Sequence, residues 1–148
     1  MTKFELEREM WIERPLSEVF LFFSDPRNLE AITPPWLRFH VQSYPDTGMK
    51  AGVEIEYQLK VRGVPLRWTS LISEWKPPFS FVDEQIRGPY SSWVHTHSFE
   101  EKDGGTLVRD HVEYSVPGGW LVNALFVRRD LEKIFDYRTM SLEEALCA

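Results

Sequence analysis

The sequence predicts an α+β domain in which one seven-stranded antiparallel sheet wraps around a long C-terminal helix. Alternation of apolar and polar residues, which is typical of half-buried strands, recurs through seven segments of the first 115 residues. After Gly119 the period becomes helical and stays so to the end of the sequence. An amphipathic helix that follows a run of strands needs a sheet to lie on. The length of 148 residues suits one domain, so we expect residues 1–148 to form a single domain.

A strand and two short helices are predicted at the start of the chain. Residues 4–12 alternate between apolar side chains and glutamates, as a half-buried strand does. Residues 18–23 read EVFLFF and predict a short, mostly buried helix. A second short helix should begin at Pro26, with Asp25 as its N-cap, and end at the Pro-Pro pair at 34–35. Further strands are then predicted over residues 37–44, 53–62, 66–75 and 79–85, between turns rich in Gly and Pro.

The last two strands form a hairpin whose register follows from its turn. Asp103-Gly104 is a strong signal for a type I′ turn, because both central positions of that turn need a positive φ. If these residues form the tip, Lys102 lies opposite Gly105. Counting outward places on one face the pairs Phe99–Val108, His97–Asp110, His95–Val112 and Trp93–Tyr114. The other face has the composition of a solvated surface, with Thr96, Glu100, Arg109, His111 and Glu113. The inward face therefore combines apolar side chains with two histidines and a carboxylate.

The C-terminal helix should begin near Trp120 and run for about 25 residues. Its predicted inward stripe has three- and four-residue spacing and comprises Trp120, Ala124, Val127, Leu131, Ile134 and Arg138, widened by Leu121, Leu125 and Phe135. A sheet rolled around this helix is able to enclose a cavity. An aromatic fraction of 14% is high for such a chain and indicates either a tightly packed core or an aromatic-lined cavity.

Composition excludes several classes of function. The net charge is −6 and no basic stripe is present, so the chain is not expected to bind nucleic acid. No apolar run approaches the length of a membrane span, and the N-terminal residues alternate and carry acids, unlike a signal peptide. Cys147 is the only cysteine, which excludes an intrachain disulfide. These features together predict a cytoplasmic protein.

The order β-α-α-β6-α resembles that of the START-like, or SRPBCC, superfamily, which includes polyketide cyclases, lipid-transfer domains and birch-pollen-allergen-like proteins. Residues 88–119, GPYSSWVHTHSFEEKDGGTLVRDHVEYSVPGG, and residues 128–138, RRDLEKIFDYR, carry a narrower likeness. They look like small bacterial proteins labelled ligand-binding SRPBCC or polyketide cyclase/dehydrase, and like similar domains found beside sugar-epimerase-like domains. The resemblance implies a helix-grip fold with an apolar cavity between the sheet and the C-terminal helix. It supplies no catalytic motif for these residues.

A cavity that binds a small hydrophobic or amphipathic ligand is the first interpretation of this inward face. Its apolar walls would be Tyr57, Trp68, Phe81, Trp93 and Tyr114, while Asp83, Gln85, His95, His97 and Asp110 would orient a hydroxyl, carbonyl or carboxyl group. The alternative is structural: His97 and Asp110 satisfy each other across the hairpin, and Asp83 and Gln85 complete a buried network. A nearby carboxylate should keep His97 partly charged near neutral pH unless burial outweighs it.

Other interpretations start from the same polar residues. His95, His97 and Asp110 are a possible ligand set for zinc or iron, but Asp110 is placed to pair with His97, so we expect no stoichiometric metal and no permanent cofactor. A His-Asp pair would also suit a general base for cyclisation or dehydration of a polyketide-like substrate, and Cys147, near the chain end, is a poor nucleophile. A protein-interaction module is a further possibility, although no surface is singled out. His40 and His111 fall on outward faces as solvated side chains. Ligand identity and oligomeric state are open at this point.

Overall fold

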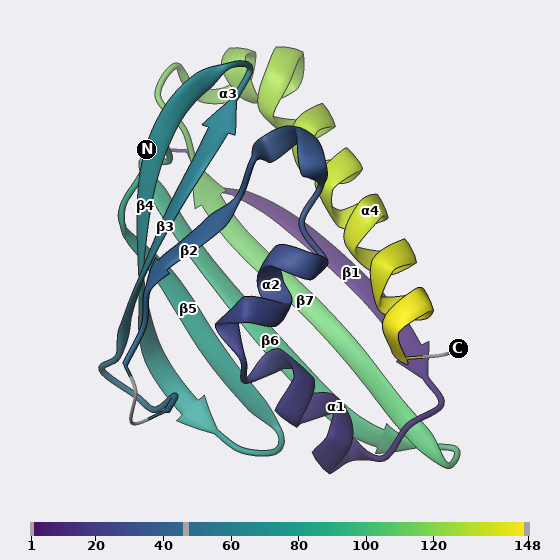
Figure 1. The fold of residues 1–148 in the computed structure, drawn as a ribbon. Coiled ribbons are helices and arrows are strands. Elements are labelled where there is room, and N and C mark those ends of the chain that lie inside the picture. The colour runs from purple at the N-terminus through teal and green to yellow at the C-terminus, as the bar shows by residue number, and fades with distance from the viewer. Residues whose placement is uncertain (1, 46–47, 147–148) are drawn as a thin grey trace.

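A seven-stranded antiparallel sheet curls around the C-terminal helical segment, as the predicted fold class requires (Figure 1). The computed structural model describes residues 2–45 and 48–146, so Cys147 lies outside the described residues. Its strand order is β1-β7-β6-β5-β4-β3-β2. The strands are β1 (Phe4–Ile12), β2 (His40–Ser43), β3 (Glu54–Val61), β4 (Val64–Lys76), β5 (Ser80–Arg87), β6 (Ser92–Lys102) and β7 (Gly105–Ser115). The helices are α1 (Leu16–Phe23), α2 (Pro26–Ala31), the 3₁₀ turn η1 (Pro35–Leu37), α3 (Gly119–Val122), the π-helical turn η2 (Asn123–Val127) and α4 (Arg128–Leu146).

The two short N-terminal helices follow the local sequence closely. Asp25 is the N-cap of α2, and its side chain accepts a hydrogen bond from the backbone N–H of Arg27 at 3.0 Å. The strand predicted over residues 37–44 is shorter than expected, because the prolines before it form the 3₁₀ turn η1 and Arg38 adopts a left-handed φ of 48°. Strand β2 therefore begins only at His40.

The β6–β7 hairpin has the register that its turn predicts. Asp103 and Gly104 have φ values of 51° and 79°, and Lys102 is the Cα partner of Gly105. All four predicted pairs, from Phe99–Val108 to Trp93–Tyr114, are present. Trp11 of β1 lies over the glycine next to the turn: a Cβ at Gly105 would come within 2.6 Å of its ring. The Trp11 indole N–H also donates a hydrogen bond to the Lys102 carbonyl at 2.8 Å, which ties the hairpin end to the edge strand.

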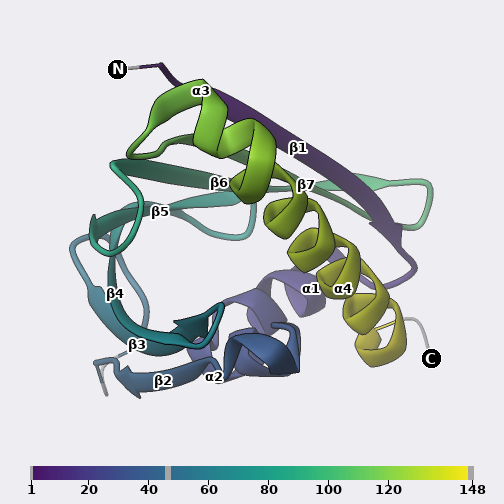
Figure 2. The same cartoon turned by 90° about the horizontal axis from the view of Figure 1, so that it is seen from above.

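The core consists of three clusters of buried side chains on the curled sheet. Seen from above, the sheet is strongly bent, with α4 across its open side and α1 and α2 along the lower edge (Figure 2). One cluster, which includes Phe20 and Leu142, joins α1 to the sheet and the end of α4. A second cluster, which includes Tyr114 and Leu131, lies under the start of α4. The third, which includes Ile72, lies on β3 and β4.

The inward stripe predicted for the C-terminal helix is wrong in its first two turns. Trp120, Leu121 and Leu125 are 69%, 51% and 54% exposed, whereas Leu131 and Phe135 are buried. The reason is the π-turn η2, which adds one residue to a helical turn and so rotates α4 by about 100° relative to α3. Among the described residues, no helix is both long and apolar enough to cross a membrane.

Candidate functional site

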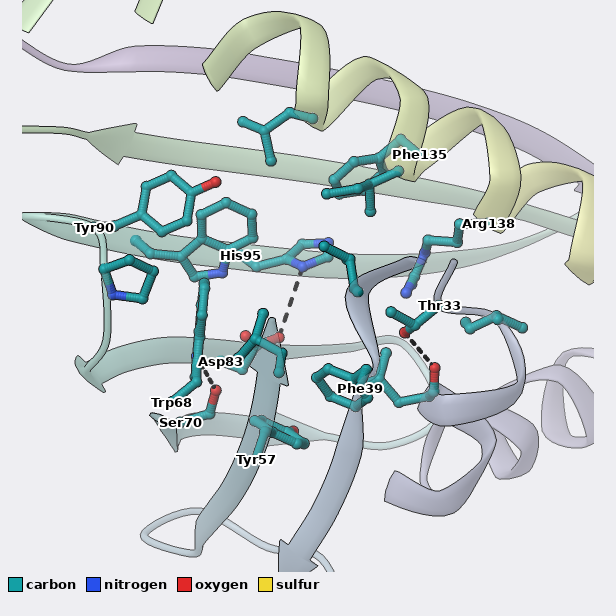
Figure 3. Close-up of a pocket in the computed structure, with 18 of the residues that line it drawn as sticks. Thr33, Phe39, Tyr57, Trp68, Ser70, Asp83, Tyr90, His95, Phe135 and Arg138 are labelled. Carbon is teal, nitrogen blue, oxygen red and sulfur yellow. Dashed lines mark hydrogen bonds and ion pairs between the residues drawn. The ribbon is translucent and has the colours of Figure 1, made fainter. Parts of the chain in front are cut away.

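A cavity of about 860 Å³ lies between the sheet and the C-terminal helical segment (Figure 3). Side chains from α1, α2, η1, strands β3 to β6 and α4 line it. Of the residues predicted to bind a ligand, those that line the cavity are Tyr57, Trp68, Phe81, Asp83, Trp93, His95 and His97. Both its size and its mixture of many rings with few polar groups are typical of sites for small molecules.

Aromatic rings form one end of the cavity. Trp68 and Trp93 meet edge to face with centroids 5.2 Å apart, and Tyr90 lies 4.7 Å from Trp93. The Trp68 indole N–H donates a hydrogen bond to Ser70 Oγ at 2.9 Å, so this wall presents ring surface to the cavity with its polar atom satisfied. Sequence periodicity does not find Tyr90, because this residue lies in the Gly-Pro loop before β6, where no period assigns a face.

Two His-Asp pairs form the polar part of the wall, and their partners differ from the predicted ones. His95 Nε2 lies 2.7 Å from Asp110 Oδ1, and His97 Nε2 lies 2.6 Å from Asp83 Oδ2. The expected partners His97 and Asp110 approach only to 3.5 Å, between Nδ1 and Oδ1. Each histidine thus bonds the carboxylate diagonal to it, because rings long enough to lean along the strand reach diagonal neighbours on the adjacent strand.

Arg138 of α4 completes this polar cluster. Its Nη2 lies 3.3 Å from Asp110 Oδ1, and its guanidinium lies over the rings of Phe23 and Phe135, at 5.3 and 5.9 Å from their centroids. Arg138 is only 6% exposed, and its Nε has no hydrogen-bond partner among the described residues. The sequence places Arg138 on the predicted inward stripe but assigns it no role. A charged residue on an apolar stripe was the signal that could have indicated one, because buried charges need a partner.

Burial and the neighbouring charges together set the protonation of the cluster. Burial alone would raise the pKa of Asp110, but the Arg138 guanidinium and the hydrogen bond from His95 outweigh it and hold that pKa well below its usual range. Burial also opposes ionisation of Asp83, yet the bond from His97 leaves the pKa of that carboxyl lowered. For His97, burial is the largest effect and lowers its pKa to about 4, so the imidazole is neutral at pH 7.

Three predicted ligand-binding residues lie outside the cavity lining. The Gln85 side chain bonds the backbone of Tyr90, donating to its carbonyl at 2.8 Å and accepting from its N–H at 3.0 Å, which holds the loop before β6. Tyr114 is fully buried and donates to Asn123 Oδ1 at 2.6 Å. Asp110 lies behind the histidines. Tyr114 and Asp110 are thus buried between the sheet and the helix and do not contact the cavity.

Contacts between the lining residues join the β3–β4 turn and η1 to the C-terminal helical segment. Arg62 and Asp130 both line the cavity, and Arg62 Nη2 lies 3.2 and 3.3 Å from the two carboxylate oxygens of Asp130. The Arg62 guanidinium also lies 5.2 Å from the ring centroid of Phe126. On the side of η1, Trp36 meets Tyr137 of α4 edge to face at 5.8 Å. These contacts lie at the cavity lining and tie the helix to both the sheet and η1.

The polar cluster offers two kinds of chemistry at the cavity wall. His95 Nε2 is held by Asp110 at 2.7 Å, and in the tautomer that carries its proton there, the free Nδ1 lies on the side of Asp83, 3.8 Å from Oδ2 (Figure 3). A nitrogen arranged in this way is able to accept a proton from a bound molecule. Asp83, His95 and His97 also bring one potential metal-ligand atom each within 4.8 Å of one another. The two histidines on outward faces take no part in this cluster. His40 is exposed, and His111 Nε2 lies 3.5 Å from Glu5 Oε1.

Comparison with known proteins identifies the family. Residues 12–143 match the family described as "Polyketide cyclase / dehydrase and lipid transport". None of the curated proteins matches the chain. Among solved structures, major latex-like protein 151 of Panax ginseng is 14% identical, with a TM-score of 0.72 and coverage of 99% of each chain. Protein CV1439 of Chromobacterium violaceum is 14% identical, with a TM-score of 0.74 and coverage of 99% of this chain and 98% of its own.

A third similar structure is TTHA0849 of Thermus thermophilus, which is 20% identical, with a TM-score of 0.62 and coverage of 95% of this chain and 92% of its own. At these identities the structures share the fold and nothing more is transferred from them. The matched family spans most of the chain, and the sheet and the C-terminal helix form the helix-grip arrangement. The chain therefore belongs to the polyketide cyclase/dehydrase and lipid transport family, within the START-like (SRPBCC) superfamily.

Proposed function

We propose that this protein binds a small hydrophobic or amphipathic molecule in the cavity and holds it for transport or sequestration. The observation that supports this most directly is a largely apolar cavity of about 860 Å³ with a cluster of His and Asp side chains in its wall. In this proposal the apolar body of the ligand contacts Tyr57, Trp68, Phe81 and Trp93, while Asp83, His95 and His97 orient its polar end. The single cysteine, with no intrachain disulfide possible, supports the cytoplasm as the setting.

The charge of the cluster favours a particular kind of polar end. The cluster contains two carboxylates, Asp83 and Asp110, but one guanidinium, that of Arg138 on Asp110, and burial keeps His97 neutral. The atoms exposed at the wall are thus mainly acceptors in a negative surrounding. A ligand that donates a hydrogen bond, such as an alcohol or a phenol, fits this wall better than a carboxylate, which would add a further negative charge.

Titration with the uncharged apolar dye Nile red tests the binding proposal. We expect saturable binding to the wild type with one dye per chain. Ile134→Trp should abolish it, because Ile134 lines the cavity from α4 and a larger ring fills the space. Met140→Trp is the matched control, since Met140 is 53% exposed on the same helix and should leave binding unchanged. No saturable binding of any apolar probe would reject the cavity proposal and favour a protein-interaction module.

An enzymatic function is a second candidate, and the orientation of His95 favours it. Its Nε2 is held by Asp110, which fixes the ring and leaves Nδ1 as the acceptor toward the cavity, as general-base catalysis requires. The reaction would be a cyclisation or dehydration that begins with removal of a proton from a polyketide-like substrate. A substrate analogue that carries deuterium at its acidic C–H position should exchange it for solvent hydrogen in the presence of the wild type. With His95→Gln it should keep the deuterium.

A further inference from the structure

Three atoms that bind metals converge at the cavity wall. Asp83 Oδ2 lies 2.6 Å from His97 Nε2 and 3.8 Å from His95 Nδ1, and all three atoms lie within 4.8 Å of one another. Ligand atoms around one zinc ion lie roughly 3 Å apart, because each is about 2 Å from the metal. Small side-chain rotations would therefore suffice to place all three atoms around one ion.

One carboxylate behind the two histidines, that of Asp110, prepares them for this role, by a hydrogen bond to His95 and at longer range to His97. Histidines that bind metals commonly donate their second N–H to a carboxylate, which fixes the tautomer and the ring orientation. Asp110 supplies that carboxylate here: it lies 2.7 Å from His95 Nε2 and 3.5 Å from His97 Nδ1. Arg138 in turn holds Asp110 at 3.3 Å. The pairing with Asp110 that argued against a metal in the sequence is thus the support that a metal-binding histidine needs, and Asp83 is the third ligand instead.

The surroundings of His97 point the same way. Its ring faces a carboxylate at each nitrogen, Asp83 at Nε2 and Asp110 at Nδ1. His97 Nδ1 is buried and has no hydrogen-bond partner among the described residues. If the proton moves to Nδ1, it points toward Asp110 and the lone pair of Nε2 faces Asp83. A cation between Nε2 and Asp83 satisfies this second arrangement completely.

The balance of charge favours a divalent ion. The cluster holds two carboxylates, Asp83 and Asp110, and one guanidinium, that of Arg138 on Asp110, so the acidic side chains outnumber the guanidinium by one. We propose that Asp83, His95 and His97 bind one divalent transition-metal ion, with its remaining coordination positions open to the cavity. Two imidazoles and one carboxylate suit Zn²⁺ or Fe²⁺, and three protein ligands leave room for water or for an oxygen of a bound molecule.

Calorimetry and cobalt spectroscopy on the chelator-treated protein test this proposal. We expect Zn²⁺ to bind one ion per chain, to raise the Tm, and to release protons. In the wild type, Co²⁺ should give the visible absorption bands of a site with nitrogen and oxygen ligands. This measurement does not depend on the folding of any variant. Asp83→Asn should weaken Zn²⁺ binding more than 100-fold, because it removes a ligand. Asp110→Asn should weaken it by about 10–100-fold, as changes behind the ligands do.

His111→Ala is the matched control, because His111 lies near Glu5 and Glu7 on the outer face and could hold a surface ion. It should leave affinity, stoichiometry and the Co²⁺ spectrum unchanged. The proposal is overturned if the wild type binds no Zn²⁺ below millimolar concentration, or if binding survives Asp83→Asn in a folded protein and is lost with His111→Ala. Nile red binding is measured on the metal-free protein, so failure of this proposal leaves the apolar-ligand proposal to its own test.

Discussion

The ring of His95 stacks on the ring of His97, with centroids 3.7 Å apart and planes inclined by 25°. These residues are two positions apart on β6 and share its inward face. The stacked pair lies between two carboxylates that come from the flanking strands, Asp83 on β5 and Asp110 on β7. Each ring thereby bonds one carboxylate strongly and faces the other at longer range. The four side chains act as one unit, and a change in any of them should affect the others.

Replacing Asp110 by asparagine should destabilise the fold by about 3–5 kcal/mol, because Arg138 would keep a buried charge without its partner. Urea unfolding measures the loss. The double variant Asp110→Asn/Arg138→Met should recover part of it, since both charges are then absent. Glu9→Gln is the control for the chemical change: it breaks an exposed pair with Arg109 and should cost less than about 1 kcal/mol. An equally small loss for Asp110→Asn would mean that Arg138 reaches water.

Stability of the chelator-treated protein should fall between pH 6.5 and pH 4. The pKa of His97 is lowered to about 4 in the folded protein, whereas an unfolded histidine titrates near 6.5. Below pH 6.5 the unfolded chain therefore binds a proton that the folded chain does not. The contribution of His97 is complete above the unfolded pKa and is lost as pH falls toward the folded pKa, by about 3 kcal/mol. His97→Gln should flatten this slope and His111→Gln should not, as urea unfolding at several pH values would reveal.

The order of the elements and the β6–β7 register were predictable, because both depend on local signals. Alternation assigns the faces of each strand, and Asp103-Gly104 fixes the pairing by counting outward from the turn. The partners of the histidines were not predictable in the same way. A longer Gly-Pro loop joins β5 to β6, so no turn fixes how Asp83 aligns with His95, and β4 pairs with β5 through irregular register.

Side-chain reach and helix phase explain what else the sequence left undetermined. The hairpin register gives Cα partners, whereas each histidine bonds the carboxylate diagonal to it. The charge on His97 depends on two opposing effects on its pKa, which burial lowers and a nearby carboxylate raises. Only the fold shows that the effect of burial is the larger. Periodicity placed Arg138 on the inward stripe but could not pair it with Asp110, because it gives the face of a helix and not where the helix lies along the sheet. The error in the first two turns has another cause, the π-turn, which no periodic pattern announces.

Leu131→Ala should cost roughly 2–5 kcal/mol of folding stability. Leu131 of α4 is only 2% exposed, and truncating its side chain leaves an unfilled space. Ile134→Ala should cost less, because Ile134 is half-buried and lines the cavity, where its outer atoms already lack packing partners. Chemical denaturation gives both values, and Glu144→Ala on the exposed face of α4 serves as the control. Equal, small losses at all three positions would mean that the helix is loosely attached to the sheet.

Arg62→Ala should speed the exchange of Nile red without changing its affinity greatly. The Arg62–Asp130 pair joins the β3–β4 turn to α4 at the cavity lining, so its loss should loosen this side of the cavity and raise the rates of entry and release together. The effect on folding stability should stay below about 1 kcal/mol, because both side chains are substantially exposed. Stopped-flow fluorescence measures the rates. Arg67→Ala, an exposed arginine on the same hairpin, should leave them as in the wild type. Unchanged rates in Arg62→Ala would place the entrance elsewhere.

The three bonds of the polar cluster close loops of different length along the chain. Asp83 bonds His97 and His95 bonds Asp110 over separations of 14 and 15 residues, whereas Arg138 reaches Asp110 over 28. During synthesis, the three strands leave the ribosome before the arginine does. In a sheet that forms before the helix docks, two carboxylates and two imidazoles lie together without their guanidinium. Docking of the helix then brings Arg138 to Asp110 and offsets one of the two carboxylate charges, so the last segment to be made relieves part of the repulsion within the strands.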